Sequence, residues 1–474
     1  MKDKDIFDLV TRYEQMVSSG KSVYFDAEDF DEIADYYDMA DEPDKAESVI
    51  DQALNIHPGN HILILKKIKL IAYKGEYQEA LSLIDGYSGD SYDVELSLLK
   101  LDCLLNLGYL GQAQELTQEI FTREKEDLDV IYSELGFIYS GIEDYDAAIA
   151  FFEKSLSYNK ENVDVLAELA YTYESKSEFT QAIRALQRIL DIEPYSYETW
   201  LNVGKLHSLL EEYENAIDAF DFAMTINDSY NDVRKLKAHC LLLCGRIDEA
   251  VVLFKECLKE DEEDKTLYYS LYECYLSVEQ YEDALAYLEK YETLCGESAE
   301  IFAKKATIYL QKGEFDKSLF YLHQGMTIDS KNVELNLIIG ELYFQMGDLD
   351  MAEDYFLKIY SGKADDRNML DRLARISIKK NDTESATDYL EKLMELEPEN
   401  EQTRIRLALL YFESGDKNNF DRLLTILTDE EVESLSSIIF SEEQDGSSPF
   451  SREDYINRLN NARECRQLYK NIIY

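Results

Sequence analysis

The sequence predicts an all-α fold: a right-handed superhelical α-solenoid of about twelve tandem helix-turn-helix repeats with terminal capping helices. Three observations support this prediction. A short motif recurs every 34 residues, apolar residues follow a helical period within each unit, and the chain of 474 residues holds only 5 Pro and 19 Gly. Because a single core rarely grows to this size, a repeat array is the simplest way to fold such a chain.

The recurring motif lies where the two helices of a unit are expected to be joined by a turn. It reads IEDYDAA at 142–148, KSEFTQA at 176–182 and LEEYENA at 210–216. Extending this spacing in both directions gives units that begin at 27, 61, 94, 129, 163, 197, 231, 265, 299, 333, 367 and 401. Only the third start departs from the period, by one residue.

Two positions of each unit carry small side chains. The eighth is Ala or Gly in nine of the twelve units, and the twentieth is Ala in ten of them. Small residues at two fixed places allow two helix backbones to approach closely. The apolar twenty-fourth position, for example Phe152 or Phe220, is expected to fill the space beside them.

This pattern resembles the tetratricopeptide repeat family over roughly residues 27–428. The family places a bulky residue at position four, Leu-Gly at seven and eight, Tyr at eleven, Ala at twenty, an aromatic at twenty-four and Ala at twenty-seven. The unit from 197 matches it with Trp200, Gly204, Ala216, Phe220 and Ala223. The second, third and twelfth units depart from the pattern at several positions. The resemblance implies stacked helix pairs that bury a continuous core.

The predicted organisation has three parts. Residues 1–26 form an N-terminal capping helix, 27–428 the repeat array, and 429–474 a C-terminal segment with a polar loop and a capping helix. Ser451 and Asp454 form a capping-box signature for this last helix. It would place Tyr455, Leu459, Ala462 and Tyr469 on one face. A separate docking helix on a flexible tether is the alternative.

Charge and cysteine content restrict the function. Lys and Arg number 48 against 98 Asp and Glu, for a net charge of −50, which disfavours binding to nucleic acid or to an anionic membrane surface. The imbalance favours basic partners, or only solubility. Seven scattered Cys do not form a disulfide framework, and no apolar stretch is long enough for membrane insertion or a secretory signal. We therefore expect a cytoplasmic protein.

No motif indicates catalysis, a cofactor or a metal site. His239, Cys240 and Cys244 form a possible metal-binding edge. However, Cys103, Cys240 and Cys274 all occupy the tenth position of their units, which is apolar elsewhere, so they are better interpreted as small buried hydrophobic residues. We expect no enzyme, cofactor or bound metal.

The resemblance implies that the first helix of each pair lines a concave groove with positions two, five, six, nine, twelve and thirteen. Two kinds of side chain stand out at these positions. Aromatic residues alternate with carboxylates in one set, which suits a partner segment carrying Lys or Arg: Phe137, Tyr171, Tyr269, Phe344, Glu134, Glu168, Glu273 and Glu341. The other set consists of basic patches, which suit carboxylates. The patch in the range 367–406 would suit an acidic segment of a partner. The basic residues are Arg372, Arg375, Lys379 and Arg406, with Lys66 and Lys69 near the N-terminus. Alternatively, the basic helix pairs within the chain with Glu430, Glu431 or Glu433.

The predicted function is a non-enzymatic scaffold that binds a peptide or protein segment in this groove. No three consecutive units supply the carboxylate clamp that some members of the family use for chaperone tails. A regulatory or assembly subunit of a larger enzyme or secretion complex is the second interpretation, and a cryptic enzyme the third.

Overall fold

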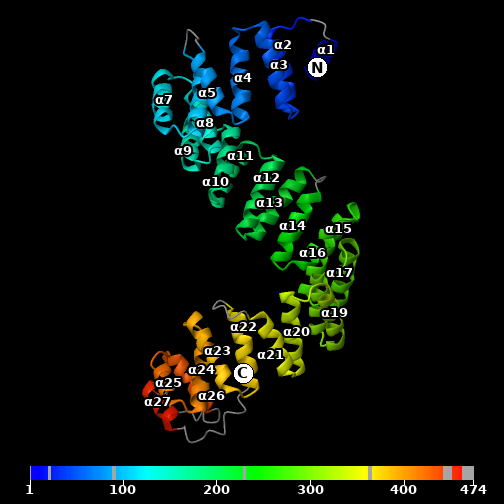
Figure 1. Ribbon diagram of the computed structural model, residues 1–474, viewed down its shortest axis with the longest axis vertical. Helices are drawn as coiled ribbons and strands as arrows, with labels where there is room; N and C mark the ends of the chain where they lie inside the picture. Colours follow the sequence, from blue (N-terminus) through cyan, green and yellow to red (C-terminus); the bar gives the residue numbers. More distant parts are fainter. Residues whose placement is uncertain are drawn as a thin grey trace. The chain divides into compact units, whose positions relative to one another are not determined.

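The computed structural model describes residues 2–19, 23–87, 92–227, 231–360, 366–440 and 451–461, and these residues contain α-helices and turns but no strand. The chain divides into two compact units, Met1–Arg246 and Ile247–Tyr474. Each unit is a row of antiparallel helices in which most helices pack against the next one in the chain, and Figure 1 shows the helices following one another in chain order. An all-helical α-solenoid is therefore confirmed.

The first unit begins with α1 (Lys2–Ser19), which packs on α2. Six helix pairs and α14 follow: α2 (Ala27–Met39) and α3 (Pro43–Ile56), α4 (His61–Tyr73) and α5 (Tyr77–Gly86), α6 (Val94–Asn106) and α7 (Leu110–Arg123), α8 (Leu128–Gly141) and α9 (Tyr145–Tyr158), α10 (Val163–Ser175) and α11 (Phe179–Ile192), α12 (Tyr197–Leu209) and α13 (Tyr213–Ile226), then α14 (Asn231–Leu243). First helices of successive pairs also contact each other, as α2 contacts α4 and α4 contacts α6.

The second unit continues the same alternation. Its helices are α15 (Ile247–Glu260), α16 (Lys265–Ser277), α17 (Tyr281–Cys295), α18 (Ala299–Gln311), α19 (Phe315–Ile328), α20 (Val333–Met346), α21 (Leu349–Ile359), α22 (Arg367–Lys379), α23 (Thr383–Leu396), α24 (Glu401–Ser414), α25 (Lys417–Leu424), α26 (Asp429–Ile439) and α27 (Arg452–Asn461).

The predicted repeat frame coincides with the helix starts. In eleven of the twelve units the first helix begins at the predicted residue, and α8 begins at Leu128 instead of 129. The residue before the helix is often a polar N-cap. Asn162, Ser196 and Asn332 accept a hydrogen bond from the backbone N–H three residues later, which satisfies one of the unpaired donors at a helix N-terminus.

The glycines at position eight have a direct steric cause. A Cβ on Gly136, Gly204 or Gly340 would lie 2.4 Å from the ring of Phe152, Phe220 or Phe356, the buried residue at position twenty-four of the same unit. Position eight is Ala and position twenty-four Leu in the units from 163, 299 and 367, whereas the unit from 231 combines Ala238 with Phe254. In the three Gly–Phe units, the ring occupies the volume that a methyl group would need.

A lysine at position fourteen of several units binds an acid at position eighteen of the preceding unit. The Nζ-to-oxygen distances are 2.8 Å for Lys74–Asp44, 2.6 Å for Lys176–Asp146, 2.5 Å for Lys312–Glu282 and 2.6 Å for Lys380–Asp350. The carboxylates raise the pKa of each of these lysines. A single exposed pair of this kind contributes little to the free energy of folding. The pairs nevertheless neutralise these lysines within the array.

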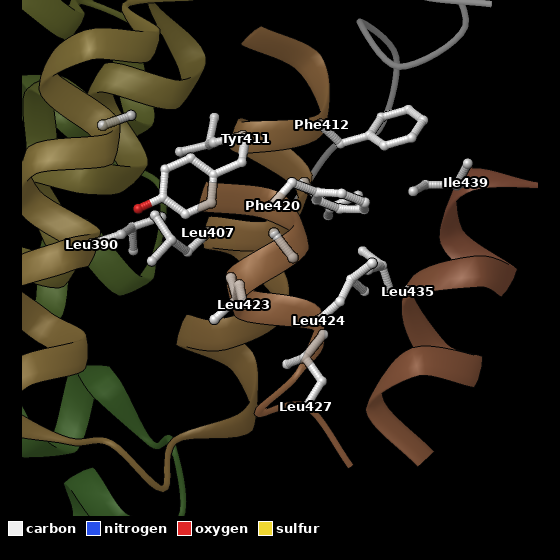
Figure 2. Packing of buried hydrophobic residues seen from close by; sticks show 14 of the residues in the cluster. Leu390, Leu407, Tyr411, Phe412, Phe420, Leu423, Leu424, Leu427, Leu435 and Ile439 are labelled. Atoms are coloured by element: carbon white, nitrogen blue, oxygen red, sulfur yellow. The ribbon is translucent and has the colours of Figure 1, made fainter. Parts of the chain in front are cut away.

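The twelfth unit departs from the pattern, as its sequence indicates. Phe420 replaces the small residue at position twenty, lies fully buried 5.4 Å from the Phe412 ring, and belongs to the short helix α25. Figure 2 shows Phe420 together with Leu424 and Leu427 facing Leu435 and Ile439 of α26. Because a bulky residue takes the place of Ala here, α25 does not repeat the usual pair, and its apolar residues pack against α26.

The predicted capping box at the start of α27 is confirmed. The Ser451 backbone N–H donates to Asp454 Oδ2 at 3.0 Å, and the Asp454 N–H donates to Ser451 Oγ at 3.3 Å. Leu459 is fully buried, and Tyr455 packs against the same core cluster. Ala462 and Tyr469 lie outside the described residues. Within 451–461, the helix thus packs on the array.

A buried ion pair joins α26 to α24. Arg404 donates from Nε to Glu431 Oε1 at 2.8 Å, and Glu431 Oε2 accepts the backbone N–H of Thr428 at 2.7 Å. The side chains are 12% and 2% exposed. Because both charges are removed from water, each charged group depends on its partner for electrostatic stabilisation.

We predict that Gly340→Ala lowers the unfolding midpoint in urea, since overpacking a core costs about 1–3 kcal/mol. In a Phe356→Leu background the same change should be neutral or stabilising, because the methyl group then has room. Gly111, also helical but with nothing within 4 Å of its Cβ position, is the matched control, and Gly111→Ala should stabilise. A Gly340→Ala cost that is unchanged by Phe356→Leu would refute the shared-volume explanation.

We also predict that Glu431→Gln increases hydrogen exchange in 429–439 far more than elsewhere, because breaking one partner of a buried pair costs about 3–5 kcal/mol. Replacing both residues, as Arg404→Met with Glu431→Leu, should recover part of the protection. The exposed pair Arg123–Glu119 is the control, and Glu119→Gln should cost less than about 0.5 kcal/mol. Equal effects of the two glutamine variants would contradict this role.

Candidate interaction surface

The predicted groove residues all lie on first helices, but they fall into both units. In the first unit, they are Lys66 and Lys69 on α4, Glu134 and Phe137 on α8, and Glu168 and Tyr171 on α10. In the second unit, they are Tyr269 and Glu273 on α16, Glu341 and Phe344 on α20, Arg372, Arg375 and Lys379 on α22, and Arg406 on α24.

Most of the predicted basic residues are neutralised by the adjacent repeat. Position nine of one unit lies next to position six of the following unit, so Glu341 accepts a hydrogen bond from Arg372 Nε at 2.7 Å. Asp35 and Lys66 pair in the same way. Arg406 Nη1 donates to Asp371 Oδ1 at 2.7 Å, and Lys69 pairs with Glu95. These four cations are already occupied within the chain.

The alternative that the basic helix pairs with acids of the same chain is correct for Arg372, but the predicted partners are wrong. Arg372 and Arg406 bind acids of the preceding repeat, and neither binds Glu430, Glu431 or Glu433. Glu431 binds Arg404 instead. The physical reason is the stacking of first helices, which places position six against the unit before it and not against the end of the chain.

Arg375 and Lys379 differ from these cations. Neither makes an ion pair among the described residues, and both side chains are exposed. Both contact one aromatic ring, with Arg375 Cζ 5.7 Å and Lys379 Nζ 3.9 Å from the centroid of Phe344. The sequence assigned Glu341 and Phe344 to the aromatic and acidic set, and Arg375 and Lys379 to the basic set. The structure brings the two sets together, because Glu341 and Phe344 lie against α22.

Tyr269 and Glu273 also have a cation of their own. Lys304 on α18 lies 5.4 Å from the Tyr269 ring centroid and 3.3 Å from Glu300. Burial raises the pKa of Glu273, and the nearby Lys304 charge opposes that rise. The sequence prediction did not include Lys304, although it stands at position six of the unit after Glu273, the same relation as in Glu341–Arg372.

Glu134 and Glu168 lack such a partner. Neither carboxylate makes an ion pair among the described residues, and burial raises the pKa of Glu134 despite the influence of Lys69. Tyr171 is 58% and Phe137 36% exposed, although the Phe137 ring rests edge-on against Phe152 at 5.3 Å. These residues thus combine incompletely neutralised carboxylates with exposed aromatic surface.

Two further carboxylates of the first unit were missed by the sequence prediction. Burial raises the pKa of Asp102, whose carboxylate accepts from the Asn106 amide at 2.9 Å, and burial followed by the Asp35 charge raises that of Asp31. They occupy positions nine and five of their units. The positions could have identified them, but their partial burial depends on neighbouring helices.

The three cysteines of position ten are buried, as predicted, and burial raises the pKa of the Cys103 thiol to about 11 and of Cys274 to about 12. Within the described part of the chain, no three His, Cys, Asp or Glu side chains gather in a way that could hold a metal ion. None of the described helices combines the length and apolar character needed to cross a bilayer.

Stacked helix pairs with a polar first-helix face define the class of helical-repeat scaffolds. Models of the tetratricopeptide repeat match residues 143–205 and, in two copies, 333–361 and 368–400. A model of anaphase-promoting complex, cyclosome, subunit 3 matches 210–291. These matches show that the chain is built from tetratricopeptide repeats, which serve in general as scaffolds for protein interaction and assembly.

Individual relatives are distant. The chain is 22% identical to a DnaJ homolog subfamily C member 7 homolog of Dictyostelium discoideum, covering 54% of this chain and 47% of that protein. It is 27% identical to anaphase-promoting complex subunit 8 of the same organism, over 36% of this chain and 28% of that protein. The chain thus spans less than half the length of these relatives. The crystal structure of the APC/C hetero-tetramer Cut9-Hcn1 is similar with a TM-score of 0.36 and 13% identity, over 91% of this chain and 89% of that one.

The half-buried carboxylates predict an unusual pH dependence of stability. Because the pKa values of Asp31, Asp102, Glu134 and Glu273 are raised in the folded state, the folded state binds more protons than the unfolded state near these pKa values. Stability is then lost as pH rises through them. We expect the thermal midpoint, followed by circular dichroism, to rise by a few degrees between pH 7 and pH 5. The variant Asp102→Asn should reduce the rise, and an unchanged rise would contradict the assignment for Asp102.

Proposed function

We propose that this protein is a non-enzymatic scaffold whose first-helix faces bind an extended segment of another protein, and that the first unit prefers a segment carrying Lys or Arg. One observation carries the proposal. Glu134 and Glu168 are not paired within the described chain, while the predicted cations Lys66 and Lys69 are. The surface that remains available around these residues of α8 and α10 is therefore anionic and aromatic.

The physical basis is the unfavourable charged state of the Glu134 carboxylate without a ligand. A raised pKa means that the surroundings of Glu134 disfavour its charge. An ammonium or guanidinium group from a partner would relieve this cost, and the exposed Tyr171 ring offers a face for the same cation. The net charge of −50 would also attract a basic segment over a longer range.

A regulatory or assembly subunit is the second candidate, favoured by the likeness to anaphase-promoting complex subunit 8. In that case the same surfaces would hold fellow subunits. A cytoplasmic location, with basic proteins as partners, remains part of the proposal. The chain is also 22% identical to a Giardia intestinalis UDP-N-acetylglucosamine--peptide N-acetylglucosaminyltransferase over 40% of its own length. Because the match covers only 13% of that enzyme, we do not propose its activity for this chain.

The proposal predicts that the full-length protein binds a labelled peptide rich in Lys and Arg, measured by fluorescence anisotropy, and that Glu134→Lys with Glu168→Lys weakens binding about tenfold or more, which corresponds to about 1.4 kcal/mol. The control is Glu115→Lys with Glu153→Lys, exposed residues of α7 and α9 that change the net charge equally. Binding should also weaken on acidification, beginning at a higher pH than for an ordinary glutamate.

Two results would reject this preference. One is equal binding of the basic peptide and its glutamine-substituted counterpart. The other is equal weakening by the groove variant and the control variant, which would show that only the overall charge of the chain matters.

A further inference from the structure

Helix α22 carries more positive charge than its surroundings neutralise. Arg367 Nη1 lies 3.5 Å from Glu397, and Arg372 binds Glu341. Lys380, directly after the helix, binds Asp350 and Glu353. Arg375 and Lys379 alone among the cations of 367–380 make no ion pair within the described residues. Other exposed cations, such as Lys358, also make no ion pair within these residues, so it is the arrangement of Arg375 and Lys379 that sets them apart.

The two cations are presented together on one face. Arg375 and Lys379 are four residues apart, so they are neighbours on the surface of α22. Both head groups lie within cation–π distance of the centroid of the Phe344 ring of α20. The ring positions the charges without neutralising them, and both charges stay accessible to solvent. The side chains are thus arranged before any ligand binds, which reduces the entropy lost on binding.

The surface here suits a macromolecular segment better than a small molecule. A cleft lined by Glu341, Phe344, Phe356, Arg372 and Arg375 has a volume of only about 10 Å³, whereas pockets for small ligands usually measure about 300 Å³ or more. Two accessible cations are also far too few for nucleic acid, which the net charge of −50 would repel. A peptide that carries a short run of carboxylates can pair with both charges at once.

We propose that Arg375, Lys379 and the Phe344 ring form a docking site for an acidic segment of a partner protein. The site rests on the scaffold function proposed above and adds a second binding preference to it, opposite in sign to that of the first unit. Its cations stand at positions nine and thirteen with the aromatic residue at twelve of the preceding unit. Arg372 would contribute by holding Glu341 away from the incoming carboxylates.

The test uses the full-length protein and a labelled glutamate-rich peptide, with its glutamine counterpart as the neutral reference. We expect the glutamate peptide to bind at least about tenfold more tightly than the glutamine peptide. Arg375→Glu with Lys379→Glu should abolish this difference, and Phe344→Leu should reduce it. The control Lys358→Glu with Lys417→Glu alters α21 and α25 by the same charge and should leave binding unchanged; Lys358 is also a cation–π lysine, 3.7 Å from the Tyr355 ring centroid.

The outcomes separate this site from the scaffold proposal. Equal binding of the glutamate and glutamine peptides, or equal effects of the two double variants, would overturn the docking site. If the lysine-rich peptide still binds in a manner that depends on Glu134 and Glu168, the scaffold proposal survives that result. Sedimentation velocity identifies the other occupant: self-association that Arg375→Glu with Lys379→Glu abolishes would show a second copy of this acidic chain on the site and overturn the assignment to a different protein.

Discussion

The close approach of the two helices within each repeat is the constraint on which the rest of the structure depends. Position eight is Ala or Gly in nine of the twelve units, and where it is Gly, position twenty-four of the same unit fills the volume beside it, as Gly340 and Phe356 show. This contact fixes how the second helix lies on the first. Since most repeats use a version of it, the same face of each first helix is left out of the core, and the residues on that face are free to differ from unit to unit.

Regular stacking also has an electrostatic consequence. Because neighbouring first helices repeat the same offset, position nine of one unit meets position six of the next, and Asp35–Lys66 and Glu341–Arg372 are two occurrences of one relation. The lysines at position fourteen follow a second relation of this type. A charge at such a position is therefore either neutralised by the adjacent repeat or left for a ligand, and the residue at the paired position decides which.

This distinction changes how the surface is interpreted. Charge alone suggested two basic patches, but Lys66, Lys69, Arg372 and Arg406 are bound within the chain. What remains is a pair of cations around Phe344 in one unit and incompletely neutralised carboxylates beside Tyr171 in the other. The proposed binding preferences follow from these residual charges, which are smaller and more local than the net charge of −50 indicates.

The sequence by itself determined the helical repeat, its frame and the small residues of the core, because these depend on contacts within one unit and recur every 34 residues. It also determined which positions lie outside the core. Only the tertiary structure decided which of those residues remain available: that Arg404 meets Glu431 in a buried pair, that Lys304 accompanies Tyr269, and that Phe344 lies under Arg375. Each of these contacts joins different helix pairs, and the residue types that meet differ from one repeat to the next. A pattern read along one sequence reveals what is repeated, whereas the pairing of single side chains depends on the distance and orientation between helices that packing alone sets.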